Sequence, residues 1–147
     1  MMKWRPFLVI LLLALAGCGG GSEETQTVVS VPAAATAPSP PAMPPDVARV
    51  VRNLQASSSG VRRDAAKLAC RSYSRDPHVL QVANRELLNG YTRNMTDRVH
   101  IDAMAWLCKT LAASGKKQYA ETLRKVVAGT SNRKLIKYAK ESLRQLE

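Results

Sequence analysis

The sequence has few of the residues on which most recognisable active sites are built. Among 147 residues there are two histidines, three cysteines and one phenylalanine, and aromatic side chains make up 5% of the chain. A zinc site needs His, Cys, Asp or Glu clustered at short spacings, and His78 and His100 belong to no such cluster. The longest apolar run falls short of the roughly 20 residues that a membrane-spanning helix requires. We therefore expect neither a metal site nor a stable membrane span.

The sequence also lacks a catalytic constellation and a cofactor motif. Asp64 and Asp102 could be taken as paired acid–base carboxylates, but they recur at one position of an internal repeat. Stabilisation of a turn between repeats explains that recurrence more simply. The SSSG stretch at residues 57–60 lacks the glycine spacing and the following lysine of a phosphate-binding loop. We expect no catalytic residue and no cofactor.

The N-terminal segment that ends at Cys18 carries the most specific pattern that is present. Lys3 and Arg5 precede an uninterrupted apolar run at residues 7–16, which is the arrangement of a secretory signal. The run ends in the tetrapeptide LAGC, which resembles the lipobox of bacterial lipoproteins. The resemblance implies a signal peptide at residues 1–17, cleavage before Cys18 and acylation of Cys18. Two or three acyl chains, at about 0.8 kcal/mol per buried CH₂, would anchor the protein firmly. The alternative is an ordinary secretory signal in which Cys18 is fortuitous.

Residues 18–45 follow as a predicted disordered linker behind the lipidated cysteine. Residues 19–45 contain six of the eight prolines of the chain together with Gly, Ser, Thr and Ala, a composition that cannot bury a core. Gly19 stands directly after Cys18. The absence of Asp at this position resembles the sorting signal for the outer membrane in enteric-type bacteria. We therefore expect a lipid-anchored protein of the bacterial envelope, at the outer membrane and facing the periplasm.

Residues 46–147 are long enough for one small domain, and their apolar spacing is helical throughout. Asp76-Pro77 combines a capping side chain with proline at the first helical position, which marks a helix start. Other boundaries fall at Asn89-Gly90, Ser114-Gly115 and Gly129. The expected helices begin near Pro45-Asp46, Ser59-Gly60, Asp76-Pro77, Thr96-Asp97, Lys116 and Ser131-Asn132. Six helices and no strand predict an all-α domain.

The helices repeat along the sequence. The segment VRRDAAKLACRSY from Val61 aligns with VHIDAMAWLCKTL from Val99, and a weaker copy begins at Leu135. Helix pairs that recur with a period of about 40 residues are typical of α-solenoids. Residues 102–146 resemble the HEAT-like repeats of small bacterial lipoproteins. The resemblance implies a short HEAT/armadillo-like α-solenoid of about six helices, of a kind used mostly as a binding scaffold.

This register predicts one continuous stack of buried side chains. Trp106 lies on a mostly apolar helix, so we expect it to pack in the core as well and not to form a ligand platform. The predicted stack comprises Val61, Ala65, Leu68, Val99, Ala103, Leu107, Leu123, Val127, Ala139 and Leu143.

The charge balance is strongly basic. The whole chain has a net charge of +11, and residues 46–147 carry 20 Lys and Arg against nine Asp and Glu, because Lys3, Arg5, Glu23 and Glu24 alone precede them. Such a surplus attracts anionic partners. Two helical stripes of cations are either solvated faces or a functional surface: Arg63, Lys67 and Arg71, and Lys137, Lys140 and Arg144.

The function predicted from these features is non-catalytic binding. In an envelope the available anions are lipid head groups, lipopolysaccharide, cell-wall polymers and acidic proteins. Export and the lack of interleaved aromatic residues argue against nucleic acid. We expect a lipid-anchored binding or scaffold module with a protein or anionic partner. An enzyme or enzyme subunit with a dispersed site and a nucleic-acid-binding module remain as alternatives.

The sequence leaves open whether Cys70 and Cys108 form a disulfide. Once Cys18 is lipidated, Cys70 and Cys108 form an even pair in an oxidising compartment, which favours a disulfide. They occupy equivalent positions in successive repeats, where side chains point in parallel on helices about 8 to 10 Å apart. A disulfide requires Cα atoms within about 4.4 to 6.8 Å. Cys70 and Cys108 are therefore a candidate bridge or two small buried apolar residues.

Overall fold

The computed structural model describes residues 43–147, and within them all regular structure is helical with no strand. The all-α prediction is confirmed for this part of the chain. The expected signal peptide, Cys18 and residues 18–42 of the linker lie outside the described residues. The elements are α1 (Pro45–Leu54), α2 (Ser59–Ser72), α3 (Pro77–Gly90), α4 (Arg98–Ala113), the short 3-10 turn η1 (Lys117–Tyr119), α5 (Ala120–Gly129) and α6 (Arg133–Leu146).

Polar side chains begin three of the helices where the sequence predicts a start. The Asp76 side chain accepts a 3.0 Å hydrogen bond from the backbone N–H of Val79 at the start of α3. At the start of α4, the Asp97 side chain accepts a 2.8 Å hydrogen bond from the backbone N–H of Val99. The Asn132 side chain accepts from two backbone N–H groups of the first turn of α6. Each cap satisfies donors that a helix leaves unpaired at its N-terminus, and together they fix these boundaries.

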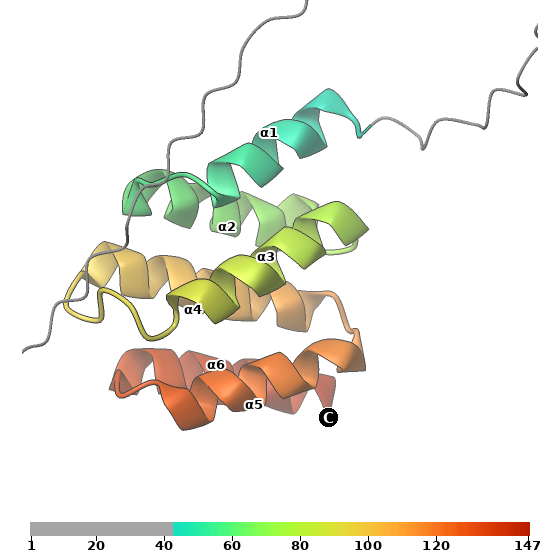
Figure 1. Cartoon of the computed structure of the whole chain (residues 1–147). Helices are drawn as coiled ribbons and strands as arrows, with labels where there is room; N and C mark the ends of the chain where they lie inside the picture. Colours follow the sequence, from blue (N-terminus) through green and yellow to red (C-terminus); the bar gives the residue numbers. More distant parts are fainter. Residues whose placement is uncertain (1–42) are drawn as a thin grey trace, which may run out of the picture. The chain divides into compact units, whose positions relative to one another are not determined.

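The helices pack as three consecutive pairs, which Figure 1 shows stacked one below another. Within the pairs α1 contacts α2, α3 contacts α4 and α5 contacts α6. Between the pairs α2 packs against α4 and α4 packs against α6, while α1 packs against α3 and α3 contacts α5. The domain therefore has two helical layers, with α2, α4 and α6 side by side in one of them.

The core lies between these layers and includes half of the predicted stack. Ala65, Ala103, Leu107, Leu123 and Ala139 are buried, whereas Val99, Val127 and Leu143 are partly buried. Val61 and Leu68 are 43% and 40% exposed, so their prediction as core residues is wrong. The buried side of α2 consists instead of alanines, Ala65, Ala66 and Ala69. In a helix so rich in alanine, the larger apolar side chains do not mark the buried face.

The predicted helix boundaries at Gly90 and Gly115 are confirmed, whereas the start predicted at Lys116 differs in the structure. The sequence predicts that this helix stops at Asn89-Gly90, and α3 does end at Gly90, which is buried. A Cβ atom at this position would lie 2.7 Å from Met104 Sδ, so the glycine permits close packing against α4. The segment expected to start as a helix at Lys116 begins with η1 and continues as α5. Gly115, with φ +67°, ends α4 as predicted, in the left-handed conformation that favours glycine.

Candidate functional site: two basic surfaces

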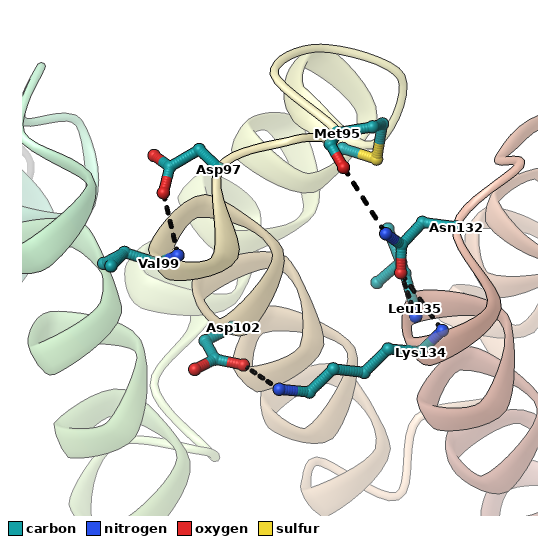
Figure 2. A network of polar contacts seen from close by, with 7 residues as sticks. All are labelled: Met95, Asp97, Val99, Asp102, Asn132, Lys134 and Leu135. Atoms are coloured by element: carbon teal, nitrogen blue, oxygen red, sulfur yellow. Dashed lines mark hydrogen bonds and ion pairs between the residues drawn. The ribbon is translucent and has the colours of Figure 1, made fainter.

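The N-terminal ends of α2, α4 and α6 are joined by side-chain hydrogen bonds. Ser59 Oγ donates a 2.8 Å hydrogen bond to Asp97 Oδ2, which links the start of α2 to the cap of α4. Asn132 Nδ2 donates to the Met95 carbonyl oxygen at 3.5 Å, and so connects the cap of α6 to the segment before α4 (Figure 2). These bonds hold the three helices in a common register and thereby fix the surface that they present together.

The two repeated aspartates lie inside helices and pair with Lys and Arg side chains, whereas the sequence predicted that they stabilise a turn between repeats. Asp102, in the first turns of α4, accepts a hydrogen bond from Lys134 of α6, an ion pair that Figure 2 shows crossing between the two helices. Asp64 pairs within α2, at 2.9 Å from Arg63 and 3.8 Å from Lys67. The hydrogen bond from Arg63 lowers the pKa of the Asp64 carboxyl. Both aspartates therefore hold cations in place.

The first surface is a hollow of about 310 Å³ across α2, α4 and α6. We refer to it as the basic groove. Two of the predicted cations, Arg63 and Lys67, line the groove, whereas Arg71 is exposed and does not. The side chains that line it are Arg63, Lys67, Asp102, Ala105, Trp106, Lys109, Lys134 and Tyr138.

Lys109 is the cation at the centre of the groove's contacts. Its Nζ lies 4.5 Å from the centroid of the Trp106 ring and 4.6 Å from that of Tyr138, within the range of cation–π attraction. In the part of the chain that the structure describes, no carboxylate lies within 4.0 Å of Lys109. The rings therefore fix the position of the ammonium group without neutralising its charge.

Trp106 has a double role that its sequence context did not show. It packs against the core and is only partly buried, and it also lines the basic groove. The expectation of core packing alone is therefore incomplete. One signal could have identified Lys109 as a candidate: it aligns with Arg71 in the repeat, which marks a basic position present twice. Lys134 and Tyr138 of α6 have no such signal, because the third copy of the repeat is too weak to align them.

The second surface lies on α6 and contains the second predicted stripe. Lys137, Lys140 and Arg144 line one hollow of about 610 Å³, so the structure does bring this stripe together. Ile136 and Leu143, both partly buried, are its apolar residues. We define the α6 outer face by the residues that line this hollow: Arg133, Ile136, Lys137, Lys140, Glu141, Leu143 and Arg144.

The two cysteines of the domain carry free thiols in the structure, so the candidate disulfide is not formed there. Cys108 is fully buried in α4, and burial raises the pKa of its thiol to about 12. Cys70 is half-buried in α2, and burial raises the pKa of its thiol as well, while the charges of Lys109 and Arg71 oppose that effect. Neither environment favours a reactive thiolate.

The histidines are separated by the fold as well as by the sequence. His78 is exposed, whereas His100 is 2% exposed and its Nε2 lies 2.9 Å from the carbonyl oxygen of Gly90.

Among residues 43–147 no group of three or more His, Cys, Asp or Glu is placed to hold a metal ion. No helix within the same residues is long and apolar enough to cross a membrane. The feature of residues 43–147 that most suggests binding is therefore the basic groove, where a cation is held beside aromatic rings.

Comparison with known proteins adds no family or relative. No protein-family model, no curated protein and no solved structure matches the chain.

Proposed function

We propose that the protein is a lipid-anchored lipoprotein of the bacterial envelope whose helical domain binds an anionic or protein partner without catalysis. The observation that carries the proposal is the basic groove, where Lys109 is held between Trp106 and Tyr138 with no carboxylate partner among the described residues. A cation already fixed in place loses less conformational entropy on binding than a mobile surface lysine does. An anionic group is the ligand that such a site favours.

The charges around Lys109 support the same ligand class. Four cations line the groove, namely Arg63, Lys67, Lys109 and Lys134, and Asp102 is the one carboxylate among its lining residues. Asp64 lies beside them and pairs with Arg63 and Lys67. The groove therefore keeps a positive surplus, within a domain that has 20 Lys and Arg against nine Asp and Glu. This surplus raises the local concentration of anions and speeds their encounter with the site.

The scaffold that we propose for this site is a short HEAT-like solenoid. Three consecutive helix pairs, each packed against the next, are consistent with the sequence repeat that aligns Val61 with Val99. A stack of this kind places equivalent helices side by side, so that side chains from several repeats share one surface. The groove uses α2, α4 and α6 in this way.

The envelope location rests on the sequence alone. The lipobox-like LAGC at residues 15–18 supports acylation of Cys18, and the Pro-rich residues 19–45 support a linker between anchor and domain. Gly19 favours the outer membrane. The anchor would restrict the search for a partner to the periplasmic space near the membrane surface.

The proposal is tested by crosslinking in intact cells followed by pull-down of the full-length protein. Wild type is compared with Lys67→Gln/Lys109→Gln, which removes two cations of the groove. The matched control is Lys116→Gln/Lys117→Gln, which removes two exposed lysines that do not line it. We expect at least one crosslinked partner that is recovered with wild type and the control but is lost with the groove variant. Equal recovery with all three proteins would contradict the proposal.

A further inference from the structure

The α6 outer face has the features of a docking site that is separate from the basic groove. α6 packs against α4 on one side and α5 on another, and the α6 outer face is the side left uncovered by the described residues. Ile136 and Leu143 are seven residues apart, two helical turns, so they lie in one line along the helix with Lys140 between them. Partly buried apolar side chains at this spacing provide one of the two surfaces of a ridges-into-grooves contact between helices.

The charge on this face is unbalanced. Arg133, Lys137, Lys140 and Arg144 surround the two apolar residues, and Glu141 is the one acid in the lining. None of these four cations forms an ion pair within 4.0 Å among residues 43–147. This differs from the groove, where Asp102 and Asp64 hold three of the cations. An occupant of the α6 outer face therefore has to supply the negative charge itself.

We propose that the α6 outer face binds an acidic amphipathic helix of a partner protein, which would stack on α6 as α6 stacks on α4. Such a helix offers apolar side chains at i, i+3, i+4 and i+7 for Ile136 and Leu143, and acidic flanks for the cations. A membrane surface fits less well, because binding in the interface needs projecting apolar side chains and these two are partly buried. A second copy of the chain fits less well too, because the domain is strongly basic and would repel itself.

The test uses the full-length protein in nanodiscs of neutral lipid and a fluorescent helical peptide as the probe. The peptide is about 18 residues long, with leucines on one face and glutamates on both flanks, so that it is at least as long as α6. A scrambled peptide of the same composition serves as the comparison, and anionic phosphatidylglycerol vesicles and sedimentation of the protein alone test the other occupants. We expect saturable binding of the amphipathic peptide, at least about tenfold tighter than that of the scrambled one.

Variants assign the binding to the α6 outer face. Lys137→Glu/Lys140→Glu should weaken peptide binding about tenfold or more, while Lys116→Glu/Lys117→Glu, with the same change of charge, should leave it within about twofold. Circular dichroism establishes that each variant is folded. Lys109→Gln, which removes a cation of the groove, should weaken the amphipathic and the scrambled peptide to the same extent and leave the ratio of their affinities unchanged, and this separates the present proposal from that for the groove. Equal binding of both peptides, equal binding by both charge-reversal variants, preference for the vesicles, or self-association without peptide binding would overturn the proposal.

Discussion

Ser59 Oγ and Asp97 Oδ2 are 2.8 Å apart, so one hydrogen bond joins the first turn of α2 to the residue that caps α4. The same carboxylate accepts from the backbone N–H of Val99 at 2.8 Å. The two bonds make Asp97 both a helix cap and a link between helix pairs that are adjacent in the stack. Both donors stabilise the ionised form of the Asp97 carboxyl.

The stability of the domain should therefore depend on pH through Asp97. The hydrogen bond from Ser59, followed by those from backbone N–H groups, lowers the pKa of the Asp97 carboxyl. A carboxyl whose pKa is lower in the folded state contributes stability above its unfolded pKa, and that contribution is lost as the pH falls through the folded pKa. Asp97→Ala should lower the urea midpoint most at pH 7, and the difference from wild type should shrink below about pH 4. Ser59→Ala should reduce this pH dependence. A difference that does not change with pH would show that the charge of Asp97 is unimportant.

Leu107 and Leu68 provide a matched test of the core. Leu107 is completely buried in α4, whereas Leu68 is 40% exposed on α2. Leu107→Ala should reduce the free energy of unfolding by about 2 to 5 kcal/mol, because it removes contacts and leaves a cavity. Leu68→Ala should cost less than about 1 kcal/mol. Chemical denaturation of both variants measures the two values, and a cost below about 1 kcal/mol for Leu107→Ala would place that residue outside the core.

The sequence predicted the helices better than it predicted which of their faces are buried. Asp76, Asp97 and Asn132 sit at helix starts because capping is a local interaction, readable from a few residues. Burial of α2 depends on how closely α1 and α4 approach its alanines, and this cannot be read from local spacing. Val61 and Leu68 were misplaced for that reason.

In the candidate site too, the sequence predicted the residues that share one helix better than the residues that several helices bring together. The stripe of Lys137, Lys140 and Arg144 lies on one helix, so helical spacing alone predicted that the three would share a surface. The basic groove takes its side chains from three helices, and the spacing along α2 gave only Arg63 and Lys67. Its central contact, Lys109 between Trp106 and Tyr138, joins α4 to α6 and becomes visible only when the helices are packed.

The thiols of Cys70 and Cys108 should both be free and should differ in reactivity. Denatured, unreduced protein should contain the two free thiols of Cys70 and Cys108, since neither is bridged in the structure, and Cys18 should add none if it is acylated as we propose. In the folded protein Cys70 should react with maleimide first, because Cys108 is fully buried and its pKa is raised to about 12, which leaves almost no thiolate at neutral pH. Mass spectrometry of the labelled peptides assigns the order. Absence of free thiols after denaturation would demonstrate the disulfide.

Anchoring can be tested separately from binding. Cys18→Ala should abolish incorporation of labelled fatty acid and block cleavage after Gly17, because the thiol that accepts the lipid is lost. The measurement is metabolic labelling followed by electrophoresis, with Cys70→Ala as the control that should keep full labelling. Unchanged labelling of Cys18→Ala would rule out the lipoprotein assignment and leave the ordinary secretory signal.

The most direct test of the central claim, that the basic groove binds anions, is the fluorescence of Trp106, which is the one tryptophan in residues 43–147. Mature full-length protein in neutral-lipid vesicles, which contain no tryptophan, is titrated with polyglutamate as the probe. The groove predicts a saturable change in Trp106 emission, with a Kd that weakens about tenfold, roughly 1.4 kcal/mol, in Lys109→Gln and weakens further as salt is added. No saturable change, or the same Kd in wild type and Lys109→Gln, would contradict it.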